Sequence, residues 1–344
     1  MYKNDRIYYI DLLKFIAIFG VIFIHLCGFT GHSEILNFRI SYLSEIFRFA
    51  VPVFLMITGT LLLNKDISIS QFLKKRFSRI VFPYIFWIII TIITFLFISG
   101  TLIQDYPFVI IDQFFNASWN WYFWMIMGVY FIIPVVNEFI LNKGFEACKY
   151  MIILMMFASV FYSVCVILGY GTFFDLRFFV LPISYVVLGY FLANYEFKIS
   201  RNKIILVSIM LFSISTLLKL TFHDSTIFFV NDAIYLSSGY DISFLEIIQA
   251  SAVFLLFKNL NYIILDRSII KRFITSVSRA SYGMYLAHMA ILIPISQIFK
   301  SLSSTGTQTL LSVILLSIMV VLGTWLLVLF VDKLLKLKRF SGYH

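Results

Sequence analysis

The sequence predicts an all-α integral membrane protein that crosses the bilayer about ten times. Hydrophobic residues make up 61% of its 344 residues and charged residues only 13%, whereas a soluble domain is about half apolar and about a quarter charged. A soluble fold could not hide so much apolar surface, and helices satisfy their own backbone hydrogen bonds within lipid. Most of the apolar stretches approach the ~20 residues that a helix needs to span the hydrocarbon. The ten predicted spans are 7–28, 42–63, 79–99, 122–141, 149–168, 178–195, 203–222, 242–257, 280–299 and 309–334.

The basic residues orient these spans, because Lys and Arg are enriched on the cytoplasmic side of a membrane. With the N-terminus in the cytoplasm, 21 of the 27 Lys and Arg residues fall in cytoplasmic segments and five in outer segments. The sequence therefore predicts that both termini are cytoplasmic. The first span contains Asp11 and Lys14 and lacks a small-residue cleavage site, so we expect it to be retained. With no linker or repeat, the chain is expected to form one transmembrane domain, 1–344.

Composition also narrows the classes of partner. The net charge is +10, but the basic residues lie between the spans, where membrane topology explains them, and we expect no nucleic-acid binding. The three cysteines form no C-x-x-C pattern and the five histidines lack metal-ligand spacing. We therefore expect neither a disulfide framework nor a metal.

Three ionisable residues lie in the first span, where each costs on the order of 3 kcal/mol and indicates function by default. Lys14 and His25 are eleven positions apart, which places them on one helix face about 16 Å apart along the axis. Asp11 lies one turn before Lys14 and could pair with it. The alternatives are structural: Lys14 could extend to the headgroups, and a lone buried His is more often a satisfied hydrogen-bonding group than a catalyst.

A second cationic feature precedes the third span. Arg76 and Arg79 are three positions apart, so both guanidinium groups share a face if the segment is helical. Two planar guanidinium groups, each able to form paired hydrogen bonds with phosphate oxygens, suit a phosphate-bearing ligand. Ordinary positive charge on the cytoplasmic side is the alternative interpretation.

These residues belong to an ordered set of segments that resembles the acyltransferase 3 family of bacterial membrane O-acyltransferases. Lys14 and His25 resemble its Arg, ten residues, His pattern. Further segments resemble its F-x-x-x-S-G, R-x-x-R with Pro and Tyr, H-L-W-F and S-x-G-x-Y-x-x-H motifs, at 51–59, 76–84, 121–134 and 281–288. Three residues depart from the family pattern: Lys14 stands for Arg, Trp119 for His and Thr58 for Ser.

The resemblance implies a stand-alone enzyme of the bacterial inner membrane, similar to those that O-acetylate enterobacterial common antigen and O-antigen. Its implied donor is cytoplasmic acetyl-CoA, and its implied acceptor is a hydroxyl of a cell-surface polysaccharide or lipid-linked precursor. In that interpretation His25 is the base. Lys14, oriented by Asp11, stabilises charge or positions the donor, while Arg76 and Arg79 hold its phosphates.

Three other residues are secondary candidates. His288 is a second possible base, although its apolar helix favours a structural role, as it does for Tyr285. Trp121 belongs to an aromatic outer stretch that could stack on a sugar ring or form an interfacial belt.

Two other classes of function stay open at this point. A polar stripe within ten helices also fits an exporter or flippase for a glycan or small metabolite, although the internal repeats of many transporters are not visible. A membrane scaffold without chemistry is the third possibility.

Overall fold

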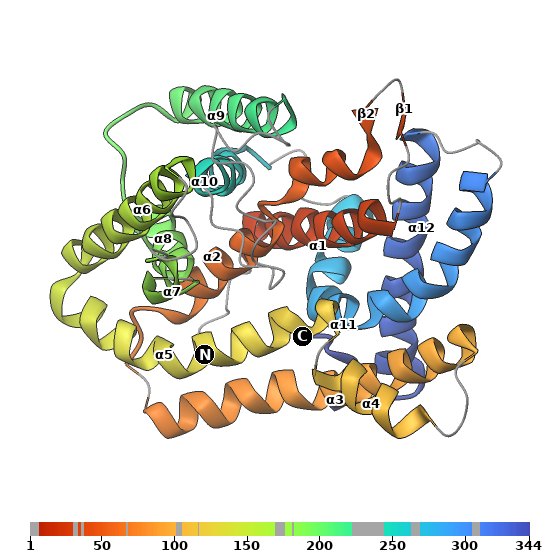
Figure 1. The fold of residues 1–344 in the computed structure, drawn as a ribbon. Coiled ribbons are helices and arrows are strands. Elements are labelled where there is room, and N and C mark those ends of the chain that lie inside the picture. The colour runs from red at the N-terminus through yellow and green to blue at the C-terminus, as the bar shows by residue number, and fades with distance from the viewer. Residues whose placement is uncertain are drawn as a thin grey trace.

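The computed structural model is a helical bundle (Figure 1), as predicted from the sequence. It describes residues 7–29, 34–35, 38–66, 68–100, 105–115, 117–168, 176–180, 182–221, 244–262, 269–304 and 310–344. The first half contains α1 Tyr8–Phe29, the short strands β1 Glu34–Ile35 and β2 Phe38–Arg39, the 3-10 helix η1 Ile40–Phe47, α2 Ala50–Leu62, α3 Ile69–Ser99, α4 Tyr106–Phe115, the 3-10 turn η3 Ser118–Asn120 and α5 Trp121–Lys143. The second half contains α6 Phe145–Ile167, α7 Arg177–Val180, α8 Ile183–Asn194, α9 Arg201–Thr221, α10 Phe244–Asn259, α11 Ile269–Ser304, α12 Leu310–Leu329, the π-helix η7 Phe330–Leu334 and α13 Lys338–Ser341.

Each of the ten predicted spans overlaps a helix of this bundle. Seven helical segments in the described residues are long and apolar enough to cross a membrane, and α8 is a shorter apolar helix. The protein is therefore a multi-pass membrane protein, while the count of ten spans and the cytoplasmic placement of both termini stay predictions. The segment α10, predicted at 242–257, is 16 residues long.

The predicted span 42–63 is confirmed as a candidate membrane span over Tyr42–Leu62, although its helix changes type between η1, which ends at Phe47, and α2, which begins at Ala50. Two predicted helix starts were wrong. The third span begins ten residues earlier than predicted, at Ile69, where Ser68 caps the helix by accepting a hydrogen bond from the backbone of Gln71. The ninth begins at Ile269. Hydropathy locates the apolar part of a helix, whereas Lys and Arg are good helix formers and let α3 and α11 continue beyond it.

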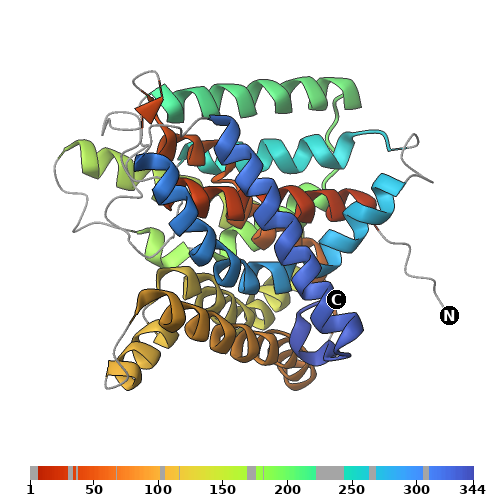
Figure 2. The ribbon, with the colours of Figure 1, turned by 90° about the vertical axis from the view of Figure 1, so that its right-hand side faces the viewer.

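Helix α1 lies at the centre of the bundle. Of its apolar window, 61% is buried, against 17% for α9, which lies at the periphery. Figures 1 and 2 show α9 on one side of α1 and α3 on the opposite side. The chain therefore buries the span that carries Asp11, Lys14 and His25 among its other helices.

A buried ion pair joins η1 to α9. Lys219 Nζ lies 2.9 Å from Glu45 Oε2, and Arg48 Nε lies 3.2 Å from Glu45 Oε1. Gln249 of α10 donates to Thr216 Oγ1 at 2.8 Å and to the Glu45 carbonyl at 3.1 Å. Because an unpaired buried charge is costly, these contacts fix the three elements relative to one another.

Helices α2 and α8 pack backbone against backbone. A Cβ on Gly59 would lie 1.7 Å from the Val186 carbonyl oxygen, and one on Gly189 would lie 2.1 Å from that of Met56. Thr60 Oγ1 adds a hydrogen bond to the Gly189 carbonyl at 3.1 Å. Small residues at such a contact are a general means of close helix packing in membranes.

We expect Gly59→Ala to lower stability by about 1–3 kcal/mol, because the added methyl group must push α2 and α8 apart. Gly128→Ala in α5 is the matched control, since its Cβ would meet nothing within 4 Å. The measurement is thermal unfolding of the purified proteins in one detergent, followed by tryptophan fluorescence. Equal midpoints for the two variants would contradict the close contact.

Candidate functional site

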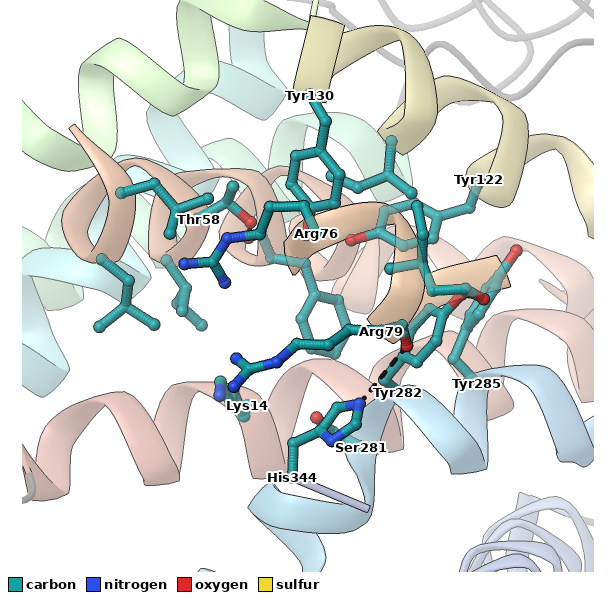
Figure 3. Close-up of a pocket in the computed structure, with 16 residues that line it drawn as sticks. Lys14, Thr58, Arg76, Arg79, Tyr122, Tyr130, Ser281, Tyr282, Tyr285 and His344 are labelled. Carbon is teal, nitrogen blue, oxygen red and sulfur yellow. Dashed lines mark hydrogen bonds between the residues drawn. The ribbon is translucent and has the colours of Figure 1, made fainter. Parts of the chain in front are cut away.

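A cavity of about 240 Å³ opens among α1, α2, α3, α5 and α11 (Figure 3). Its apolar wall comes mainly from α2, and its aromatic wall from tyrosines of α5 and α11. The lining residues are Lys14, Phe54, Ile57, Thr58, Leu61, Leu62, Arg76, Arg79, Ile80, Tyr122, Ile126, Tyr130, Ser281, Tyr282, Tyr285 and His344.

Three cationic side chains reach this cavity from two helices. Lys14 comes from α1, and Arg76 and Arg79 from successive turns of α3, and all three point into the same space in Figure 3. Among the sixteen described lining residues none is acidic. Like charges repel one another, so an anion that enters the cavity lowers the electrostatic energy of the three cations. The cavity can therefore bind a negatively charged ligand.

Arg76 is the deepest of the two arginines. Its side chain is half-buried, and its guanidinium carbon lies 5.8 Å from the centre of the Phe72 ring. Within the described residues its Nε has no hydrogen-bond partner. Arg79 is exposed at the cavity mouth. The two positions together present guanidinium groups at two depths of one opening.

Asp11 ties α1 to α11. Its carboxylate is 3% exposed and accepts hydrogen bonds from Ser278 Oγ at 2.7 Å and from Thr275 Oγ1 at 3.3 Å. Sequence reasoning did not find these two hydroxyl groups, because nothing local indicates which helix faces Asp11. The pairing of Asp11 with Lys14 stays a prediction.

His25 and His288 meet across the interface of α1 and α11. Their ring centres are 5.0 Å apart at an angle of 40°. His288 is 1% exposed, and its Nδ1 contacts the Tyr285 carbonyl oxygen. A carbonyl can only accept, so Nδ1 carries the proton and Nε2 carries the lone pair. Within the described residues Nε2 has no hydrogen-bond partner, which leaves it able to accept a proton.

Tyr285 lies between the cationic cavity and the two histidines. It lines the cavity, its ring is 4.8 Å from that of Tyr122, and it is 5.7 Å from that of His288. Its hydroxyl donates to the Trp119 carbonyl at 2.7 Å. Trp119 stands where the family motif has His, and here its backbone supplies the contact. A line of rings thus leads from the cavity to the histidine pair.

The remaining predicted residue, Trp121, does not line the described cavity. Its ring lies 6.1 Å from that of Tyr122, which does line the cavity. The cavity also contains a residue that sequence reasoning missed, His344. Its position after a run of basic residues indicates only a cytoplasmic tail, and no local signal predicts that the tail folds back.

We expect Asp11→Asn to lower stability by roughly 1 kcal/mol, because hydrogen bonds to a charged acceptor are stronger than those to a neutral one. Ser278→Ala removes one partner of the same carboxylate, so the losses in the double variant should be less than additive. Thermal unfolding of the wild type, both single variants and the double variant measures this coupling. Fully additive losses would show that the two side chains act independently.

A family model described as an acyltransferase domain, of the acyltransferase 3 type, matches residues 7–329. Searches of curated proteins and of solved structures each found no match. The matched range covers nearly the whole chain and includes both histidines and all three cavity cations, which confirms the resemblance at the level of the family. The chain belongs to the acyltransferase 3 family and is a multi-pass membrane acyltransferase.

Proposed function

We propose that this acyltransferase moves an acetyl group from cytoplasmic acetyl-CoA to a hydroxyl of a cell-surface polysaccharide or its lipid-linked precursor, in the bacterial inner membrane. The observation that carries the proposal is a cationic cavity that lies next to two adjacent histidines. The described lining residues of this cavity include no Asp or Glu, and Tyr285 contacts both the cavity and His288. A cation cluster suits a phosphate-bearing donor, and a histidine near neutral pH suits proton transfer.

The donor is held at the cavity by its phosphates. Guanidinium groups form two parallel hydrogen bonds with phosphate oxygens, so Arg76 and Arg79 provide the principal contacts. Lys14 adds a compact charge from α1. The cavity is smaller than the usual range of about 300–1,000 Å³ for ligand pockets, so only part of coenzyme A fits within it. Its thioester arm extends past Tyr285 toward the histidines.

His25 is the proposed general base for the transfer. It takes the proton of the acceptor hydroxyl as the oxygen forms a bond to the acetyl carbon and the carbon–sulfur bond breaks. The coenzyme leaves as a thiolate and regains a proton from the imidazolium. His288 stands beside His25 with its lone pair on Nε2, where it can share that proton. Lys14 lies about 16 Å from His25 along α1 and therefore positions the donor rather than the reacting carbonyl.

The positions of the α3 arginines and of His25 support transfer across the membrane. Because Lys and Arg are enriched on the cytoplasmic side of a membrane, we place the α3 arginines at the cytoplasmic side, where acetyl-CoA is made. His25 lies near the opposite end of α1, which is the side from which a surface glycan or its precursor arrives.

We expect His25→Ala to abolish detectable acetylation, since loss of a general base costs about 10²–10⁴-fold in rate. Cells lacking the protein are complemented with wild type, His25→Ala or His288→Ala at matched membrane levels, and surface glycans are analysed by mass spectrometry. Wild type should add one acetyl mass per modified sugar. If glycan mass never changes and glycan reaches the surface only with wild type, the proposed transfer is wrong and export takes its place.

We expect Arg76→Gln to raise the KM for acetyl-CoA at least tenfold with a smaller change in kcat, because phosphate contacts remote from the reacting carbon stabilise the bound donor and the transition state equally. Lys75→Gln is the matched control, since Lys75 is an exposed neighbour on α3 that does not line the cavity. Purified protein in detergent, assayed with a glycan acceptor, gives both constants. Equal KM values for the two variants would place the donor elsewhere.

A further inference from the structure

The chain after η7 folds back against α3 and α11. We call residues 336–344 the C-terminal strap; it contains α13 and ends at the cavity. Figure 2 shows this end of the chain beside the helices that it covers. Arg339 places its guanidinium carbon 3.6 Å from the centre of the Phe82 ring, and the Phe340 ring packs against Phe82 and Phe86. The strap thus has its own apolar and cation–π contacts with α3.

Hydrogen bonds anchor the strap at three places. Trp87 Nε1, on a fully buried side chain of α3, donates to the Ser341 carbonyl at 3.1 Å. Ser341 Oγ donates to Asp332 Oδ1 at 2.9 Å, and the backbone nitrogen of His344 donates to the Arg279 carbonyl at 2.9 Å. Such bonds to buried partners contribute about 1 kcal/mol each, so the strap is a defined wall of the structure.

A glycine pair brings the strap against α11. Gly342 has φ +73°, a left-handed conformation that other residues adopt at a cost. A Cβ on Gly342 would lie 2.8 Å from the backbone of Gly283, and one on Gly283 would lie 2.2 Å from the Ser341 carbonyl oxygen. The two backbones touch, so a methyl group at either position displaces the strap.

This docking places the His344 side chain in the cationic cavity. In Figure 3 its ring lies beside Arg79, and Nε2 is 3.4 Å from the Arg79 carbonyl oxygen. The charged groups that act on it are Arg79 of α3, Lys14 of α1 and Asp332 of η7. Arg76 lines the same cavity, while α11 presents the uncharged Ser281 and Tyr282 there.

The surroundings of His344 favour its neutral form when no anion is bound. Partial desolvation lowers its pKa, and Arg79 and Lys14 act in the same direction, opposed by the Arg79 carbonyl and by Asp332. A phosphate that enters the cavity reverses this balance, because it neutralises the two cations and itself attracts a proton to the imidazole. Proton binding at His344 and anion binding in the cavity must then favour each other.

We propose that His344 is a proton-linked phosphate-binding residue of the donor cavity, held in position by the C-terminal strap. The identity of the ligand as coenzyme A rests on the proposed function; the linkage itself requires only a phosphate-bearing ligand. Because the neutral imidazole carries no charge and ligand binding favours its protonation, His344 contributes a positive charge mainly when ligand is present. The cavity therefore gains a fourth cation when ligand binds, while in the free protein the neutral imidazole does not repel Lys14, Arg76 and Arg79.

Calorimetric titration of the purified protein with coenzyme A tests the proposal. Titrations at pH 7 in two buffers of different ionisation enthalpy give the number of protons taken up on binding. The phosphomonoester of the ligand titrates near pH 6, so the measured quantity is the difference between the wild type and a variant. Relative to His344→Gln, we expect the wild type to take up additional protons, at most one per ligand. Its Kd should rise more steeply between pH 6 and 8, by up to about tenfold per pH unit.

Two further variants separate the side chain from the strap. Gly342→Ala keeps His344 but displaces the strap, and should lose the additional proton uptake as His344→Gln does. Lys338→Gln removes a positive charge from an exposed position of the strap outside the cavity and should behave as wild type. Equal proton uptake by wild type and His344→Gln overturns the proposal. Rapid hydrogen exchange at the Ser341 amide of Gly342→Ala would show that the strap is displaced, and full proton uptake by that displaced variant also overturns the proposal.

A parallel titration with inorganic pyrophosphate distinguishes this proposal from the identity of the donor. If pyrophosphate binds with His344-dependent proton uptake and coenzyme A does not bind, the proposed donor is wrong and the role of His344 stands. If coenzyme A binds and the histidine variant takes up the same number of protons, the donor stands and the role of His344 is wrong.

Discussion

The structure depends on the burial, at the centre of the bundle, of an apolar helix that carries three ionisable residues. Each ionisable group of α1 would be costly in lipid, so α1 is enclosed by α2, α10, α11 and α12. Helix α11 supplies polar partners for α1. The hydroxyl groups of Thr275 and Ser278 donate to Asp11, and the imidazole of His288 lies beside His25. Because one rigid helix carries both ends of this polar face, the separation between Lys14 and His25 is fixed by helix geometry and not by loops.

The same pair of helices connects two environments of opposite character. At one end Lys14 joins two arginines in an open cavity whose described lining residues include no Asp or Glu. At the other end, His288 is buried among apolar side chains with one nitrogen held by the Tyr285 carbonyl. Charge repulsion makes the first environment receptive to anions, and the fixed tautomer makes the second receptive to a proton. Acyl transfer from a phosphate-bearing donor requires both, and Tyr285 is the side chain that touches each.

The strap shows how a short segment can complete such a site at little cost to the free protein. The strap is attached by the backbone contact of Gly342 with Gly283 and by the hydrogen bond that the buried Trp87 indole donates to the Ser341 carbonyl. These contacts position the His344 imidazole although it does not lie on a helix. The aromatic contacts of Arg339 and Phe340 hold the segment to α3, the helix that carries the two cavity arginines. Movement of α3 relative to α11 would therefore change the strap and the cationic cavity together.

The sequence by itself determined the features that follow local periodicity and composition. These are the all-α membrane class, the approximate positions of the spans, the common face of Lys14 and His25, and the common face of Arg76 and Arg79, because helical spacing fixes them. Only the tertiary structure decided which helices meet. The pairing of His25 with His288, the hydroxyl partners of Asp11, and the return of His344 to the cavity join residues far apart in the chain. Apolar helices resemble one another in sequence, so long-range packing, which sets these contacts, leaves little local trace.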